Sequence, residues 1–521
     1  MMRHPIRAAG VAAIALLGAC ENPGEPEPQV DPTACDRLNA AGAVYAGDVQ
    51  LGVGEAMPLA AGSSLCLALP DAAGREYVLA YVDTRAIEAS RTAREPALDS
   101  FTVTLRGGAG AAASRTPVAP GAARRAALQP HDDFRTADAP GQVNFHPAAR
   151  QMPWTQGETF TLLDNIRGGN RPARVHRVYD GWLVVASFDD TPPPGMAQTV
   201  AVMDQAWPSI RQHGMPMLTA AFGRLPFSSL KAGQLLLVFR PDISAGGVAY
   251  GATNGVDVFS WLAVRPLDVN GGTMHGLASV VFHEITHAFQ RQYLSDTRPA
   301  GTPAAVLPGG GRWGIEGGAS LMQRELYRRQ AGLGLTTNFD WRAATDDAQM
   351  GYANYAQPGD GSFHEAYGVS AGLLNDLVVR RTRAGEPLET AITEVLRGAV
   401  EGWYGWVGAE GPPRAGMTER TRAKLGGGWS PAEGMLTWAL SHAMDDRTRS
   451  DVFQDRAFKD VGEVYEGEWG WAPHAEVGAG SGASSAKRLY GSAGFYTVVG
   501  GGAFHVSANR EGVRWMIGRV K

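Results

Sequence analysis

Two histidines and a glutamate stand together at His283, Glu284 and His287, inside an otherwise apolar stretch. On an α-helix, residues four apart lie on one face, so both imidazoles can reach a single tetrahedral Zn²⁺. Glu284 falls beside them, where a carboxylate can take a proton from a metal-bound water. The spacing therefore predicts a metal centre with His283 and His287 as ligands and Glu284 as general base.

The residues around this motif predict the element that carries it. Residues 277–293 have the pattern of one continuous helix that is apolar on most of its surface, as expected for a buried helix. Three ionisable groups buried on one helix are costly unless something such as a metal compensates them. A pair of hydrogen-bonded core histidines is the alternative.

A catalytic zinc usually takes three protein ligands and leaves one position for water. In the metzincin pattern the third ligand is a histidine six residues after the second, with a glycine midway; Tyr293 and Gln290 occupy those positions, which excludes that class. Glu316 offers another ligand, because the small residues 317–320 would let a helix that begins there press against the first. A solvated glutamate at a helix start is the alternative.

The segment Trp313-Gly-Ile-Glu-Gly-Gly-Ala319, together with the His-Glu-x-x-His motif, resembles the gluzincins. These zinc metallopeptidases have two His and one Glu as ligands, and their second element is typically Trp-x-x-Glu-Gly-x-Ala. The resemblance implies that His283, His287 and Glu316 bind Zn²⁺ and that Glu284 is the general base. It also implies a zincin-like catalytic domain in which an edge strand of the sheet runs along the substrate cleft.

Two features of the expected centre are open at this point. Thermolysin-like enzymes place an Asp four residues after the ligand Glu, whereas Ser320 stands here, so the partner of His283 is not identified. A zinc hydrolase also needs a donor for the developing oxyanion. Residues 363–377 resemble the helix that follows the Glu motif in several gluzincin-like families. They make Tyr367 the expected donor, with His364 and Tyr355 behind it; local packing of the Tyr367 ring is the alternative.

The strand and helix patterns predict an α+β fold: a zincin-like catalytic domain with a mixed sheet, an active-site helix and a helical C-terminal subdomain, flanked by small N- and C-terminal β domains. A helix expected over 196–222 should be broken or bent at Pro208 and Gly214. The expected boundaries are a signal peptide over 1–19, a tether over 20–34, an N-terminal β domain over 35–106, a flexible linker over 107–150, the catalytic domain over 151–460 and a C-terminal β region over 461–521.

The N-terminus has the pattern of a secretory signal. Its last four residues, Leu17-Gly-Ala-Cys20, resemble the bacterial lipobox, which implies that Cys20 is lipidated and anchors the chain to the membrane of the cell envelope. An ordinary signal peptide with a coincidental cysteine is the alternative. The pair Arg124-Arg125 in the linker is either a processing site or two solvated arginines.

Cysteine count and charge limit the remaining possibilities. Without Cys20, the chain has two cysteines, Cys35 and Cys66, and a disulfide between them is the natural inference for an exported protein; two free buried thiols are the alternative. The formal charge of −5 becomes −7 once Arg3 and Arg7 of the signal are removed. No basic stripe studded with aromatic residues is present, so nucleic acid is not an expected partner.

These features predict an exported zinc-dependent peptidase that acts on a peptide or protein substrate. The alternative is a catalytically silent surface lipoprotein that keeps a zincin fold and binds protein or glycan. Glu284 favours the enzyme, because a purely structural zinc site does not require a base.

Overall fold

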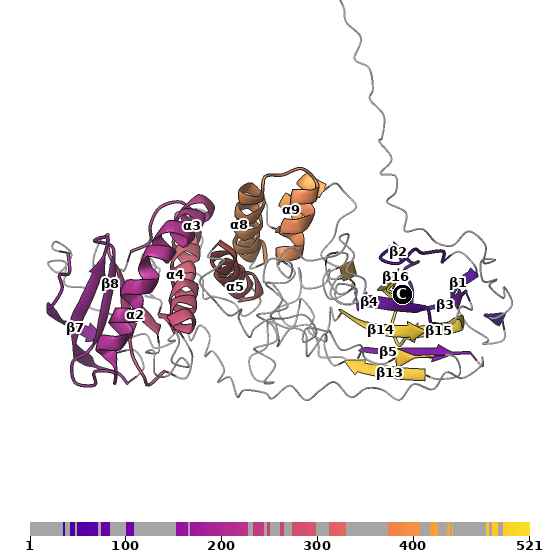
Figure 1. The fold of residues 1–521 in the computed structure, drawn as a ribbon, viewed down its shortest axis with the longest axis horizontal. Coiled ribbons are helices and arrows are strands. Elements are labelled where there is room, and N and C mark those ends of the chain that lie inside the picture. The colour runs from indigo at the N-terminus through magenta and orange to yellow at the C-terminus, as the bar shows by residue number, and fades with distance from the viewer. Residues whose placement is uncertain are drawn as a thin grey trace, which may run out of the picture.

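The protein is an α+β chain in the computed structural model, as predicted, with β-sheets at both ends of the molecule and helices between them (Figure 1). The structure describes residues 35–36, 42–46, 49–70, 74–83, 101–108, 153–164, 167–227, 233–243, 247–250, 261–264, 274–297, 312–329, 374–406, 417–425, 434, 436–437, 440, 476–478, 482–487 and 493–521. Within these ranges, no helix combines the length and apolar character needed to cross a bilayer. The predictions for Cys20, the tether, Arg124, Arg125, Tyr355, His364 and Tyr367 concern residues outside the described ranges.

Strands from both ends of the chain form one β-sandwich (Figure 1). One sheet has the order β1-β3-β15-β5-β13, and the other has the order β12-β14-β4-β16-β2. The bounds are β1 Ala43–Ala46, β2 Ala56–Pro58, β3 Ser64–Leu69, β4 Glu76–Asp83, β5 Phe101–Gly107, β12 Glu476–Val477, β13 Gly482–Lys487, β14 Ala493–Val499, β15 Gly502–Ala508 and β16 Val513–Arg519.

This arrangement corrects the expectation of two separate β domains at 35–106 and 461–521. β15 lies between β3 and β5, and β4 lies between β14 and β16, all in antiparallel pairs. The physical reason is that the strands of either end alone would have unpaired edges and an uncovered apolar face. Strands from the other end pair with those edges and cover that face. Tyr81 of β4 packs against Tyr496 and Trp515 in the shared core, with ring centroids 6.0 Å apart in each pair.

Cys35 and Cys66 form the disulfide that the sequence suggests. Cys66 lies on β3 and is fully buried, so the bond attaches the segment before β1 to a strand that lies between β1 and β15.

The second β unit is a six-stranded mixed sheet of order β10-β11-β9-β8-β7-β6. β8, β9 and β11 are parallel, whereas β10 runs antiparallel to β11 at one edge of the described sheet. The helices cover one face, which carries Leu183, Val185, Leu235 and Leu237. The bounds are β6 Thr159–Leu163, β7 Asn170–Tyr179, β8 Leu183–Phe188, β9 Leu235–Phe239, β10 Gly247–Tyr250 and β11 Trp261–Val264.

The helix expected over 196–222 is divided where the sequence indicates a bend. It consists of α2 (Met196–Ser209), the π-helical turn η3 (Ile210–Gly214) and α3 (Met215–Phe222). Gly214 is the last residue of the π-helical turn. It packs against the helix that carries Phe282, since a Cβ built at Gly214 would lie 2.4 Å from a ring carbon of Phe282. The missing side chain therefore allows α4 (Met274–Thr297) to approach closely.

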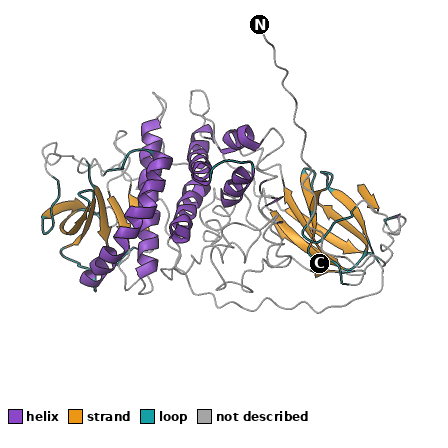
Figure 2. Ribbon diagram, turned by 45° about the horizontal axis from the view of Figure 1, so that its top comes forward, coloured by secondary structure: helices purple, strands orange, loops and turns teal. Residues whose placement is uncertain are grey.

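The middle of the molecule is a layer of helices (Figure 2). It contains α4 (Met274–Thr297), α5 (Arg312–Arg329), α8 (Leu388–Trp406), α9 (Met417–Leu425) and a helical segment over 374–383. One continuous hydrophobic cluster joins these helices to the mixed sheet and to the outward face of β4, at Val78, Ala80 and Val82. The same hydrophobic cluster thus connects both β units to the helical layer.

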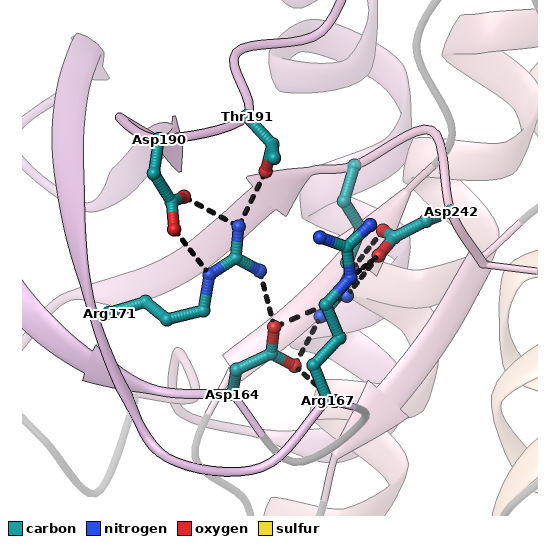
Figure 3. A network of polar contacts seen from close by, with 7 residues as sticks. Asp164, Arg167, Arg171, Asp190, Thr191 and Asp242 are labelled. Carbon is teal, nitrogen blue, oxygen red and sulfur yellow. Dashed lines mark hydrogen bonds and ion pairs between the residues drawn. The ribbon is translucent and has the colours of Figure 1, made fainter.

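An ion network closes the mixed sheet at the ends of β6 and β9 (Figure 3). The Asp164 carboxylate is fully buried and accepts hydrogen bonds from Arg171 and Arg240 at 2.5 and 2.8 Å. Arg171 also donates to Asp190, and Arg240 also donates to Asp242. Each charge in this network meets an opposite charge from the protein.

Candidate metal centre

The central polar residues lie on α4, where the sequence predicts them. His283, Glu284 and His287 are at most 5% exposed, although the helix around them is apolar. The neighbours Phe282 and Ile285 belong to the core that joins α4 to the sheet. Burial of that apolar face forces the polar residues of the opposite face toward α5.

Glu316 of α5 meets both histidines. Its Oε2 atom lies 3.1 Å from the Nε2 atom of His283 and 3.1 Å from the Nε2 atom of His287. Two ligand atoms of a tetrahedral zinc stand about 3.3 Å apart when each metal bond is about 2.0 Å. Both nitrogen–oxygen distances are therefore close to the spacing that such an ion requires.

The side chain of Glu284 lies close to the same point without joining the hydrogen bonds. Ligand atoms of His283, Glu284 and His287 all lie within 4.8 Å of one another, so this trio can hold a metal ion. Glu316 fits the role of third ligand better, because its oxygen contacts both Nε2 atoms, whereas the Oε2 atom of Glu284 is buried without a hydrogen-bond partner. Glu284 is thus available to a bound molecule.

Burial and the neighbouring histidines set the pKa of these two carboxyls in opposite directions. It raises the pKa of Glu284 to about 8, an effect that the nearby Glu316 increases and that His283 and Arg291 oppose. Burial would also raise the pKa of Glu316, but the charges and hydrogen bonds of His287 and His283 outweigh it and hold that pKa well below the usual range. Two neighbouring carboxyls thus differ widely in proton affinity, a pattern that is common at catalytic sites.

Two glutamines hold the far nitrogens of the imidazoles. The Nδ1 atom of His283 lies 2.9 Å from Oε1 of Gln323, and the Nδ1 atom of His287 lies 2.9 Å from Oε1 of Gln290. Neither role was predicted from the sequence. Helical spacing offers a signal, because Gln290 is three residues after His287 and Gln323 is seven after Glu316, so each shares a face with the residue it supports.

Gln323, and not Ser320, is the partner of His283 on α5. The Ser320 hydroxyl is buried without a hydrogen-bond partner, so it does not support His283. The partner of His283 comes instead from the next turn of α5, and it is a neutral amide instead of a carboxylate.

The position of Glu316 on α5 differs from the prediction. The helix begins at Arg312, so Glu316 lies about one turn inside it and is 2% exposed, which contradicts a solvated glutamate at a helix start. Small residues do permit close approach. A Cβ at Gly318 would lie 2.8 Å from Nε2 of Gln290, and a Cβ at Gly314 would lie 2.6 Å from the carbonyl oxygen of Ala399 on α8. These glycines let α5 fit between α4 and α8.

Tyr293 occupies the position of a metzincin third histidine, and its hydroxyl donates to Glu401 of α8. Arg420 of α9 binds the same carboxylate at 2.8 Å. Tyr293 therefore links α4 to the helices behind it and takes no part in the cluster.

Comparison with known proteins adds little to this geometry. No protein-family model and no curated protein matches the chain. Among solved structures, a two-domain M1 zinc metallopeptidase, crystallised as a mutant bound to L-tryptophan, matches 54% of this chain and 50% of its own at 16% sequence identity. The chain thus spans about half of that protein. The TM-score of 0.27 is that of a weak likeness.

Proposed function

We propose that this protein is a zinc-dependent peptidase of the gluzincin type, in which His283, His287 and Glu316 hold Zn²⁺ and Glu284 is the general base. The observation that carries the proposal is the convergence of two Nε2 atoms and one carboxylate oxygen, with 3.1 Å between the oxygen and each nitrogen. A buried carboxylate oxygen without a partner lies beside that point. This is the set of groups that metal-assisted hydrolysis requires.

Bound zinc would supply Lewis acidity, polarising the scissile carbonyl and lowering the pKa of water. Glu284 takes the proton from the attacking water and passes it to the leaving amine. Because burial raises the pKa of Glu284 to about 8, this carboxyl binds a proton more readily than an exposed one does. That affinity suits a group that must both accept and release a proton near neutral pH.

The edge of the mixed sheet offers a place for a peptide substrate. β10 pairs with β11 on one side only within the described sheet, and it contacts α4, which carries the cluster. An extended peptide can add to such an edge through main-chain hydrogen bonds. We place the substrate backbone along β10, in line with the cleft expected for a gluzincin.

Three further parts of the proposal depend on the sequence patterns. They are export to the cell envelope, lipid anchoring through Cys20 and oxyanion stabilisation by Tyr367. The lipobox-like residues 17–20 support the first two, and the resemblance of residues 363–377 to a gluzincin helix supports the third.

The proposal is tested by metal analysis of the purified protein and by Glu284→Gln. We expect one zinc per chain, and we expect the variant to keep the zinc while peptide-library cleavage falls about 10²–10⁴-fold. Asp296→Asn is the matched control on the same helix, because Asp296 pairs with Arg224 near the surface and lies outside the cluster. A protein without zinc, or equal cleavage by the Glu284 variant, would overturn the proposal. A protein that binds zinc and cleaves no peptide would instead be the binding module.

A further inference from the structure

We infer that Gln290 and Gln323 are positioning residues that lock both histidines in the metal-binding tautomer while joining α4 to α5. The inference rests on the proposed function, because it concerns how the histidines are presented to zinc. The two amides work in opposite directions. Gln323 extends from α5 to Ser279 and His283 of α4, whereas Gln290 extends from α4 to the backbone of α5.

Hydrogen bonds on the nitrogen side define the orientation of each amide. The Nε2 atom of Gln323 donates to the carbonyl oxygen of Ser279 at 3.0 Å and contacts the Ser279 hydroxyl at 2.8 Å. The Nε2 atom of Gln290 donates to the carbonyl oxygen of Ile315 at 2.9 Å. A carbonyl oxygen can only accept, so a flipped amide would place two acceptors together at each of these contacts. Both Oε1 atoms therefore face the imidazoles.

The amide orientation in turn decides the tautomer of each histidine. An Oε1 atom can only accept, so the Nδ1 atoms of His283 and His287, each 2.9 Å from one, must carry hydrogen. In a neutral imidazole the other nitrogen, Nε2, then has the free electron pair. Oε2 of Glu316 can also only accept, so without a metal its 3.1 Å contacts with both Nε2 atoms need hydrogen on Nε2, and a bound zinc would replace those hydrogens.

An amide partner on Nδ1, in place of a carboxylate, affects the charge that a bound zinc would keep. Histidine ligands commonly donate to a carboxylate, a backbone carbonyl or a water, and a carboxylate makes the imidazole a stronger donor. Here the described partners of both Nδ1 atoms are uncharged, so Glu316 is the anionic member of the proposed ligand set. Zinc held by this set would keep more of its positive charge than zinc whose histidine ligands donate to carboxylates.

The space for this arrangement depends on a glycine. Gln290 passes over Gly318, where a Cβ would lie 2.8 Å from the amide nitrogen. The same glycine belongs to the small-residue segment after Glu316, so one stretch of sequence supplies both the carboxylate and the room for the amide that supports His287.

The test is the zinc affinity of the full chain, measured by competition with a chromophoric chelator after metal removal. Gln323→Leu and Gln290→Leu should each weaken zinc binding about 10- to 100-fold. Gln292→Leu is the matched control, because Gln292 is a buried glutamine of α4 whose amide binds Asp296 instead of a histidine. Its zinc affinity should stay within about twofold of wild type, since it has no role in the ligand set.

Rescue distinguishes positioning from mere packing. Gln323→Glu keeps an acceptor for Nδ1 of His283 but replaces the donor to the Ser279 carbonyl by a second acceptor, so it should recover part of the zinc affinity that Gln323→Leu loses. If a Leu variant does not fold, ¹⁵N-histidine spectra of the zinc-loaded wild type decide the matter. Hydrogen on Nδ1 of both residues supports the inference, and hydrogen on Nε2 overturns it. Wild-type zinc binding that both Leu variants retain unchanged overturns this inference alone, whereas a wild type that binds no zinc overturns the proposed function as well.

Discussion

Two polar clusters, each centred on a buried carboxyl, are built in opposite ways. The network around Asp164 sets three carboxylates against three arginines, and every one of them lies within 3.0 Å of an opposite charge (Figure 3). The cluster on α4 and α5 turns two imidazole nitrogens and a carboxylate oxygen toward one another and leaves an oxygen of Glu284 without a partner.

The difference is one of charge balance. In the Asp164 network the protein itself supplies the compensating charge, as a buried ion cluster requires. In the histidine cluster the converging atoms are electron-pair donors, and a bound cation would satisfy all of them at once. The first arrangement serves stability, whereas the second presents ligand atoms that can hold a metal ion.

The largest effect should come from breaking the balanced network. Asp164→Leu removes the carboxylate that two buried arginines share, so it should destabilise the sheet domain by about 3–5 kcal/mol. Urea denaturation followed by tryptophan fluorescence measures the change, and the loss should be the same with and without chelator. A loss below about 1 kcal/mol would mean that water compensates the arginines.

Metal removal should lower stability through the histidine cluster on α4 and α5 and leave the Asp164 network unaffected. With free zinc at about 100 times its Kd, saturation should stabilise the protein by about 2.7 kcal/mol relative to the chelated form. Differential scanning calorimetry detects this as a rise in Tm. Glu316→Gln should abolish the rise, whereas Asp164→Leu should leave it intact; a persistent rise in the Glu316 variant would assign the third ligand elsewhere.

Substitutions at the two closely packed glycines of α5 should distinguish a loss of helix packing from a loss of zinc binding. Gly314→Ala places a Cβ against the Ala399 carbonyl, which cannot turn away, so a stability loss of about 1–3 kcal/mol is expected. Gly318→Ala meets a side-chain amide that can move, so its main effect should be weaker zinc binding. Thermal melts and chelator competition on both variants check this, and the opposite assignment of effects would contradict the packing described here.

Acid should weaken the balanced network. The hydrogen bond from Arg240 lowers the pKa of Asp242 despite partial burial, which opposes ionisation. A folded-state pKa below the unfolded value of about 3.9 stabilises the protein above that pH, and the stabilisation is lost as the pH falls through the folded-state value. The unfolding free energy of the metal-free protein should therefore decline below about pH 4, and Asp242→Asn should reduce that slope. An unchanged slope would place the acid-sensitive carboxyls elsewhere.

The smallest effect is expected at an ion pair on the surface of the same sheet. Arg174 and Asp189 approach to 2.8 Å, but their side chains are 52% and 29% exposed. Arg174→Ala should leave the midpoint of urea unfolding almost unchanged, because solvent screens the pair. A loss comparable to that of Asp164→Leu would remove burial as the explanation of the difference.

Local sequence was enough to place part of the site. His283, Glu284 and His287 lie on one helix, so their relation depends only on helical geometry, and it could be predicted. Glu316 needed a family resemblance, because nothing local relates residues 29 and 33 positions apart on different helices. Gln290 and Gln323 were missed because an isolated glutamine does not show which side chain it will meet.

The fold shows the same limit. Alternation in residues 64–69 and 76–82 predicts strands correctly, and each strand's pattern depends on its own residues. The partners of those strands lie more than 400 positions away, at β14, β15 and β16, so the expectation of separate end domains failed.

The sequence by itself thus determined which elements form and which residues of α4 share a face, because those properties depend on neighbours within a few turns of backbone. Only the tertiary structure decided that both ends of the chain build one sandwich and that Asp164 is neutralised by arginines of two other segments. It also decided that glutamines orient the histidines. These outcomes depend on which apolar faces are buried together, and that burial brings distant polar groups within hydrogen-bonding distance.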